Sequence, residues 1–314
     1  MKKTIVIIAG PTASGKTKTS IEVAKKLNTE IVSADSMQIY KYMDIGTAKP
    51  KISEMEGIPH HMIDVIYPDE DFSVAVYREM AGKCVNSIIS KNKIPIVVGG
   101  TGLYINSFLY NMDFTETPED TEYRNYLKNY AVIYGNEALH SLLKDVDRES
   151  YERLHANDTK RIIRALEVHK NSGKTITKYQ AESQNQSSDY NCIYIGLNMD
   201  RKKLYDIINK RVDNMFNIGL VDEVKNLVQM GYNKNLKSMS AIGYKEVFDY
   251  LEGIYTLEEV KEIIKRNTRR YAKRQITWFK HQGNIHWINV DDFNSISEIA
   301  ENILQYIEGS LESL

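Results

Sequence analysis

Residues 10–17 have the sequence Gly-Pro-Thr-Ala-Ser-Gly-Lys-Thr, which matches the phosphate-binding pattern G-x-x-x-x-G-K-[ST] at every position. An apolar run at residues 4–9 precedes the motif, and a helical pattern at residues 18–27 follows it. In such a strand–loop–helix setting, backbone amides and the start of the helix attract a phosphate group. The motif therefore predicts a polyphosphate site, in which Lys16 reaches a terminal phosphate and the Thr17 hydroxyl holds Mg²⁺.

Composition restricts the class of protein. Of the 314 residues, 42% are apolar and 26% are charged, which is typical of a soluble globular protein. No apolar run reaches the roughly 18 residues of a membrane span, and two cysteines are too few for a disulfide scaffold. Because the N-terminus leads directly into the phosphate loop, we expect no removable signal peptide. We expect a cytoplasmic monomer that does not bind a membrane.

The first part of the chain alternates strand and helix patterns, as α/β proteins with parallel sheets do. The runs at residues 4–9 and 94–98 are apolar throughout, as expected for central strands that are covered on both faces. We therefore predict a P-loop NTPase-like parallel sheet flanked by helices. Further strands are expected at residues 30–33, 59–65, 192–197 and 285–290, and helices at 72–90, 103–109, 201–230 with a break at Gly219, from 240 onward, 258–281 and 297–307.

Polar residues directly follow two of these strands. Residues 35–38, Asp-Ser-Met-Gln, come after the second strand, and Thr101 lies in a glycine-rich turn after residues 94–98. Ligands of open α/β sheets bind at the carboxyl ends of the strands, so Asp35 and Thr101 are expected beside the phosphate loop. A structural role is an open alternative for both, since Asp often forms turns and Thr often caps helices.

The alternation of strands and helices stops between residues 115 and 188, where the sequence is polar and helical and has no apolar strand pattern. We predict a helical insertion domain at residues 115–188. The α/β core would then comprise residues 1–114 and 189–314, with a polar linker at residues 179–189.

The helix at residues 258–281 has a strong local charge imbalance, although the whole chain has a net charge of only −1. From residue 261 to residue 280, one acid, Glu262, stands against eight basic residues, and aromatic side chains lie among them. A basic stretch is often only a solvated helix face, but this imbalance predicts binding to a nucleic-acid backbone. The basic residues are Lys261, Lys265, Arg266, Arg269, Arg270, Lys273, Arg274 and Lys280.

The phosphate loop by itself is compatible with several reactions. It could bind ATP for hydrolysis or phosphoryl transfer, or it could hold the diphosphate leaving group of another substrate. A small-molecule kinase would account for the first 110 residues, but not for the basic helix or the insertion. A nucleic-acid-binding module with a regulatory phosphate loop is a third hypothesis.

A set of motifs in a fixed order resembles the tRNA dimethylallyltransferases, also called tRNA isopentenyltransferases, in their bacterial form. The resemblance covers nearly the whole chain and is weakest at residues 115–151 and after residue 290. The motifs are Gly-Pro-Thr-Ala-Ser-Gly-Lys-Thr at 10–17, Ser-Ala-Asp-Ser-Met-Gln-Ile-Tyr at 33–40, Asp-Ile-Gly-Thr-Ala-Lys-Pro at 44–50, Pro-His-His at 59–61, Val-Gly-Gly-Thr-Gly-Leu-Tyr at 98–104, Asn-Asp at 157–158 with Arg-Ile-Ile-Arg-Ala-Leu-Glu at 161–167, Ile-Gly-Tyr-Lys-Glu at 242–246 and Lys-Arg-Gln-Ile-Thr-Trp-Phe at 273–279.

This resemblance implies that a dimethylallyl group moves from its diphosphate to N6 of the adenosine 3′ of the anticodon, in tRNAs that read codons beginning with U. It implies that Asp35 accepts a hydrogen bond and then a proton from N6, that Thr101 also contacts the adenosine, and that Arg211 reaches the departing diphosphate.

The resemblance also implies the binding residues. The anticodon stem-loop of tRNA and dimethylallyl diphosphate are the expected partners, and Mg²⁺ is the expected cofactor. Phosphate or substrate binding is expected from Gly10, Pro11, Thr12, Ala13, Ser14, Gly15, Lys16 and Thr17. Contacts to tRNA are expected from Asp35, Ser36, Met37, Gln38, Thr101, Arg124, Arg161, Arg164, Arg269, Arg270, Lys273 and Arg274.

Overall fold

The structure is a computed structural model that describes residues 2–110, 120–178 and 188–313. The chain divides into two compact units, Met1–Phe108 with Tyr190–Leu314, and Leu109–Asp189. The expected boundary at residue 115 and most of the expected linker at 179–189 lie outside the described residues.

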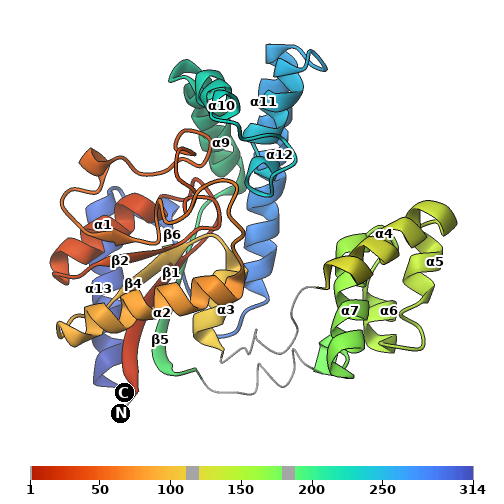
Figure 1. Cartoon of the computed structure of the whole chain (residues 1–314). Helices are drawn as coiled ribbons and strands as arrows, with labels where there is room; N and C mark the ends of the chain where they lie inside the picture. Colours follow the sequence, from red (N-terminus) through yellow and green to blue (C-terminus); the bar gives the residue numbers. More distant parts are fainter. Residues whose placement is uncertain (1, 111–119, 179–187, 314) are drawn as a thin grey trace. The chain divides into compact units, whose positions relative to one another are not determined.

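The first unit is built on a six-stranded sheet in which every neighbouring pair is parallel. The strand order β3-β2-β4-β1-β5-β6 places the strand before the phosphate loop in the middle of the sheet (Figure 1). The prediction of a parallel α/β sheet flanked by helices is confirmed. The strands are β1 (Lys3–Ala9), β2 (Ile31–Ala34), β3 (His60–His61), β4 (Ile96–Gly99), β5 (Tyr190–Asn198) and β6 (His286–Asn289).

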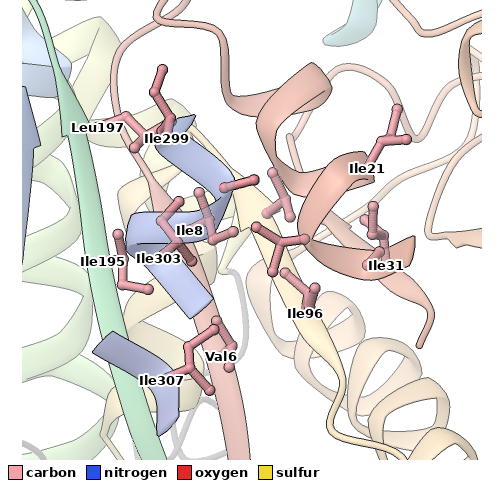
Figure 2. Close-up of a cluster of buried hydrophobic side chains, with 14 of the residues drawn as sticks. Val6, Ile8, Ile21, Ile31, Ile96, Ile195, Leu197, Ile299, Ile303 and Ile307 are labelled. Carbon is pink, nitrogen blue, oxygen red and sulfur yellow. The ribbon is translucent and has the colours of Figure 1, made fainter. Parts of the chain in front are cut away.

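Helices cover both faces of this sheet. On one face, Val6 and Ile8 of β1 pack with α1 (Lys16–Lys26) and α13 (Ile296–Glu312), as Figure 2 shows. Ile5 and Ile7 alternate with them along the strand and are also fully buried, which explains the continuous apolar run. The other helices of this unit are α2 (Val74–Ser90), α3 (Gly102–Leu109), α9 (Arg201–Asn217), α10 (Leu220–Gln229), α11 (Tyr244–Leu251) and α12 (Leu257–Lys280), with short 3₁₀ turns at Ile52–Glu54, Ser238–Ser240 and Val290–Asp292.

The register of the sheet brings three strand ends to one level. Ala9 of β1 pairs with Gly99 of β4, and Gly99 in turn pairs with Ala34 of β2. Because parallel strands run in the same direction, the chain leaves the sheet from these three positions at the same edge. The phosphate loop, Asp35 and the Gly100–Thr101 turn therefore emerge side by side.

Backbone conformation explains where the predicted element boundaries were wrong. The strand expected at residues 59–65 is reduced to His60–His61, because Met62 and Asp64 adopt left-handed φ angles of 63° and 55° that end the extended chain. The expected break at Gly219 (φ 103°) is confirmed and separates α9 from α10. The next helix begins at Tyr244 rather than residue 240, after Gly243 at φ 101°.

Helices α4 to α7 of the second unit enclose a small apolar core of their own. Glu167 of this unit is fully buried and forms ion pairs with Arg124 at 2.8 Å and with Arg164 at 2.5 Å. Burial would raise the pKa of Glu167, but the two arginines hold it below its usual value. The helices are α4 (Thr121–Tyr134), α5 (Asn136–Ser141), α6 (Arg148–Arg153) and α7 (Thr159–Ser172).

Within the described residues of both units, no helix is long and apolar enough to cross a membrane.

Replacing the buried carboxylate of Glu167 should destabilise the second unit. The Glu167→Gln variant leaves two arginines without their anion, and we expect a loss of about 3 kcal/mol of unfolding free energy. Hydrogen exchange of the α7 amides measures this loss locally. Glu137→Gln on the exposed face of α5 is the matched control and should change protection by less than about 0.5 kcal/mol. Equal protection in both variants would contradict a structural role for Glu167.

Candidate active site at the carboxyl edge of the sheet

The phosphate loop joins the end of β1 to the start of α1. Ala13 and Gly15 adopt left-handed backbone conformations, with φ angles of 68° and 88°, which curl the chain between strand and helix. Ala13 itself is buried in a small cluster with residues of α9 and α12, so the loop is packed against both helices. The Ser14 hydroxyl is buried and has no hydrogen-bond partner among the described residues, so it remains available to a polar ligand.

Lys16 lies at the first position of α1, with its ammonium group turned back over the loop. Its Nζ donates a hydrogen bond to the Pro11 carbonyl oxygen at 2.5 Å. Burial lowers the pKa of Lys16 to about 7; the negative charge of Asp35 opposes this shift, and the positive charge of Arg211 adds to it. Lys16 of the phosphate loop, Asp35 after β2 and Arg211 of α9 are therefore close enough to influence one another electrostatically.

Asp35 performs the turn role that the sequence left open and still keeps part of its carboxylate for other partners. Its Oδ1 accepts hydrogen bonds from Met37 N at 2.9 Å and from Gln38 N at 3.4 Å. No residue of the described segments donates to Oδ2. Burial raises the pKa of Asp35, against the opposing effects of these two backbone bonds and of Lys16. A carboxylate with a raised pKa is a stronger base than an ordinary surface Asp.

Thr101 connects the turn after β4 with the turn after β2. Its Oγ1 accepts a hydrogen bond from Ser36 N at 3.0 Å and lies 3.3 Å from Ser36 Oγ. The carbonyl group of Thr101 closes the first turn of α3 by accepting from Tyr104 N at 3.0 Å. The Thr101 side chain therefore holds the Asp35 turn in place.

Arg211 extends from α9 to the phosphate loop, although an Arg on a helix is more often simply solvated. Its Nη1 lies 3.5 Å from Thr12 Oγ1, and burial lowers the pKa of the guanidinium. Arg211 and Lys16 thus place two desolvated positive charges at one loop, which is a site suited to a multiply charged anion.

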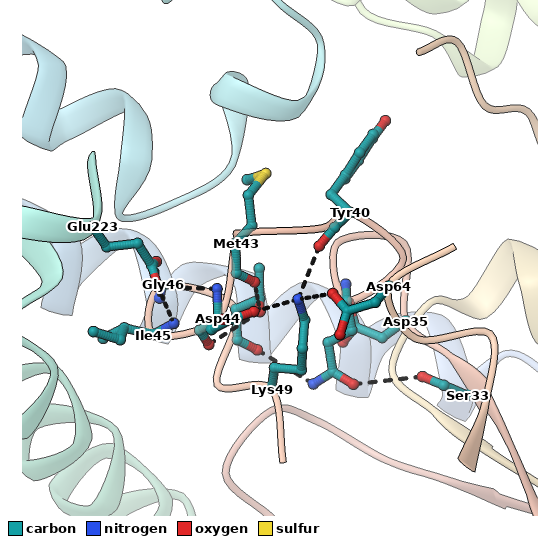
Figure 3. A network of polar contacts seen from close by, with 12 residues as sticks. Ser33, Asp35, Tyr40, Met43, Asp44, Ile45, Gly46, Lys49, Asp64 and Glu223 are labelled. Atoms are coloured by element: carbon teal, nitrogen blue, oxygen red, sulfur yellow. Dashed lines mark hydrogen bonds and ion pairs between the residues drawn. The ribbon is translucent and has the colours of Figure 1, made fainter. Parts of the chain in front are cut away.

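The segment Asp44–Lys49 is fastened next to the Asp35 turn by the polar network in Figure 3. Glu223 of α10 accepts hydrogen bonds from the amides of residues 44, 45 and 46 at 3.0, 2.7 and 3.1 Å. Lys49 bridges Asp44 and Asp64 at 2.5 and 2.6 Å. The segment in turn accepts two bonds of 3.3 Å from Gln38 Nε2, through the Thr47 and Ala48 carbonyls. The network therefore orients Gln38.

Helix α12 contributes three residues that sequence reasoning missed as parts of the site. Gln275 hydrogen-bonds both the phosphate loop and the turn after β4. Tyr271 lies near Thr101 and Gln275, and burial raises its pKa well above the usual value. Trp278 packs on Gly102, where a methyl group would lie 2.1 Å from the indole nitrogen. The helical spacing of these residues was visible in the sequence, but the helix face that they occupy was not.

The structure sorts the basic residues of α12 into two groups. In the N-terminal half, Lys261 is paired with Glu258 at 2.8 Å and Lys265 with Asp213 at 2.7 Å. Arg269 donates to Asn209 at 2.5 Å. In the C-terminal half, four exposed residues form no ion pair with an acid of the described chain, and they are Arg270, Lys273, Arg274 and Lys280; Arg266 is the exposed residue without such a pair in the N-terminal half. The free positive charge is therefore concentrated near the end of the helix that carries Gln275.

The three arginines of the second unit that are predicted to contact tRNA differ in their partners and exposure. Arg124 and Arg164 are partners of the buried Glu167, so part of their function is structural. Arg161 is different: its side chain is 71% exposed and lies 3.8 Å from Asp158. Arg161 is therefore the most accessible of the three.

The described residues contain no group of three or more His, Cys, Asp or Glu side chains that could form a metal cage. A Mg²⁺ ion bound with a phosphate does not need one, because it keeps several waters and takes one or two protein oxygens together with phosphate oxygens. The exposed Thr17 hydroxyl and the unpartnered Ser14 hydroxyl fit that donor set.

Comparisons with known proteins point to one family. A family model described as IPP transferase matches residues 38–282. A tRNA dimethylallyltransferase from Acetivibrio thermocellus is 54% identical over 303 residues, covering 96% of this chain and 97% of that protein. The crystal structure of a tRNA isopentenylpyrophosphate transferase from Bacillus halodurans is 43% identical, with a TM-score of 0.73 and full coverage of both chains. A eukaryotic dimethylallyltransferase acting on tRNA is 29% identical, with a TM-score of 0.77, covering 91% of this chain and 74% of that one.

Removing the Arg211 charge should weaken the anion site. The Arg211→Met variant should bind inorganic diphosphate about 10- to 100-fold more weakly, because it loses a charge-assisted contact of about 1.5–3 kcal/mol. Isothermal titration calorimetry with Mg²⁺ and diphosphate measures the difference. Lys210→Met, which removes an exposed charge from the next position of the same helix, should bind within twofold of wild type. Equal affinities for all three proteins would contradict an anion site at Arg211.

Proposed function

This chain belongs to the tRNA dimethylallyltransferase family, and from that premise we propose which of its residues carry out each part of the reaction. The enzyme transfers a dimethylallyl group to an adenosine of tRNA. We propose that the donor is dimethylallyl diphosphate, and that the acceptor is N6 of the adenosine 3′ of the anticodon in tRNAs that read codons beginning with U. The bond between the allylic carbon and the diphosphate oxygen breaks, and a carbon–N6 bond forms.

The leaving diphosphate is bound by the phosphate loop and α9. Lys16 and Arg211 stabilise the negative charge that develops as the allylic carbon departs, because both are desolvated and directed at the same loop. The loop amides and the N-terminus of α1 add partial positive charge. Mg²⁺ bound at Thr17 would supply further neutralisation of the diphosphate.

Asp35 acts on the acceptor. The exocyclic amine of adenine is a weak nucleophile because its lone pair is delocalised into the ring. A carboxylate that orients the amine and takes its proton as the new bond forms raises its reactivity. Asp35 Oδ2 is available for this role, since Oδ1 is held by the turn, and Thr101 supports the same turn through Ser36.

The target adenosine must leave its stack to reach Asp35, as in other enzymes that modify a base. We propose that Arg270, Lys273 and Arg274 bind the phosphate backbone of the anticodon stem-loop while the base enters the site. These charges lie on the helix that also carries Tyr271 and Gln275, so backbone binding and the reactive groups share one rigid element.

One observation carries the proposal: two desolvated cations and a carboxylate with a raised pKa meet at one edge of the sheet. Phosphoryl transfer would use the cations, but it would not account for the basic residues of α12 or for the second unit. Family membership decides against the kinase and against the regulatory module.

Asp35→Asn tests the base. With isotopically labelled dimethylallyl diphosphate and tRNA from cells that lack the modification, wild type should transfer label to tRNA. The variant should lose about 100- to 10,000-fold in kcat, because general-base catalysis contributes roughly that factor. Binding of tRNA, measured by filter binding, should stay within about threefold, since Asn preserves the shape of the turn. A parallel loss of tRNA affinity and kcat would contradict a role as base.

Neutralising the free charges of α12 tests the tRNA surface. The triple variant Arg270→Gln, Lys273→Gln, Arg274→Gln should weaken tRNA binding and reduce the slope of log affinity against log salt by about 2–3, roughly one for each lost phosphate contact. The control is Lys261→Gln with Lys265→Gln, which removes charges already neutralised within the protein. An unchanged slope in the triple variant would rule out this surface.

A further inference from the structure

Gln275 occupies a position between the two loops of the site that no proposed step uses. It lies on α12, is only 6% exposed, and has both ends of its side-chain amide occupied. We propose that Gln275 is a positioning residue, which sets the spacing between the diphosphate-binding loop and the turn that carries Thr101. The inference rests on the proposed function, because it names what aligns the donor side of that reaction with the acceptor side.

The two hydrogen bonds of Gln275 reach two loops that follow different strands. Its Oε1 accepts from Thr12 N at 2.8 Å, in the phosphate loop after β1. Its Nε2 donates to the Gly100 carbonyl oxygen at 2.9 Å, in the turn after β4. The partners determine the orientation of the amide, because Thr12 N can only donate and the Gly100 oxygen can only accept. Both contacts span more than 170 residues of sequence.

Each anchored residue is next to a reactive group. The hydroxyl of Thr12 lies 3.5 Å from Arg211, which faces the leaving group. Gly100 directly precedes Thr101, whose hydroxyl holds the Asp35 turn through Ser36. One amide therefore connects the cation that stabilises the departing diphosphate with the carboxylate that receives the proton. A misplacement of about 1 Å between such groups can cost roughly 100-fold in rate.

Gly100 provides an independent sign that this contact is built into the site. A methyl group at Gly100 would lie 2.2 Å from Gln275 Nε2, well inside contact distance. No positive φ angle requires glycine at this position, so the absence of a side chain is explained by the close approach of Gln275. The Thr12 amide, being bound to Gln275, is also not directed at the ligand; the predicted phosphate contact of Thr12 is left to its hydroxyl.

The contact can be tested through a double-mutant cycle. Gln275→Ala removes both hydrogen bonds, and Gly100→Ala displaces the amide sterically. Each should lower kcat by about 10- to 100-fold, while the Kd for tRNA stays within twofold, because the exposed cations of α12 are unchanged. The double variant should be no slower than the worse single variant, since both changes break one contact. Thr277→Val, an exposed change on the same helix, is the control and should keep wild-type kcat.

A second measurement separates positioning from general destabilisation and from the reaction itself. Calorimetric binding of inorganic diphosphate should weaken about tenfold in Gln275→Ala and stay at the wild-type value in Thr277→Val. A merely structural role would lower thermal stability but leave kcat and diphosphate affinity per folded molecule unchanged, and that result would overturn the inference. Additive losses in the cycle, or an equal loss of tRNA affinity, would overturn it too. If wild type binds diphosphate but transfers no label, the proposed function fails, and the diphosphate measurement still decides the role of Gln275.

Discussion

The site depends on the parallel register of β2, β4 and β1. Ala34, Gly99 and Ala9 lie at one level of the sheet, so the three segments that follow them start from the same edge. Residues separated by more than 60 positions in sequence become neighbours there, as the bond between Thr101 and Ser36 shows. A shift of one residue in any strand would turn its side chains to the other face and move the following loop away from the site.

Burial shifts the pKa values of three ionisable groups at this edge of the sheet. Lys16 and Arg211 are both desolvated, and burial lowers the pKa of each. Asp35 is desolvated as well, but burial of a carboxyl group raises its pKa. A diphosphate would restore the favourable surroundings of the two cations. In the proposed reaction, the two buried basic groups would bind the leaving group, and the carboxylate with a raised pKa would polarise the acceptor.

In the proposed function, helix α12 carries both the residues that bind tRNA and residues that contact the loops of the site. Near its C-terminus the helix exposes Arg270, Lys273 and Arg274, whereas Tyr271 and Gln275 face the loops of the site and the partly exposed Trp278 packs on Gly102. Because an α-helix is rigid over this length, a phosphate bound by the exposed residues has a defined distance from the loops of the site. The N-terminal half of the same helix uses its lysines for internal ion pairs instead.

The sequence by itself determined the elements that depend on local patterns. The apolar run of β1, the glycine-lysine motif after it and the break at Gly219 follow from residue types and spacing, and the structure has each of them. The family followed from motifs, which compare residues position by position. Only the tertiary structure decided which basic residues are free and which are paired, because Glu167 reaches Arg124 across more than 40 positions. It also decided that Gln275 faces Thr12 and Gly100: a helix pattern fixes the angle between side chains but not the direction in which the helix is turned, and that direction comes from packing with distant parts of the chain.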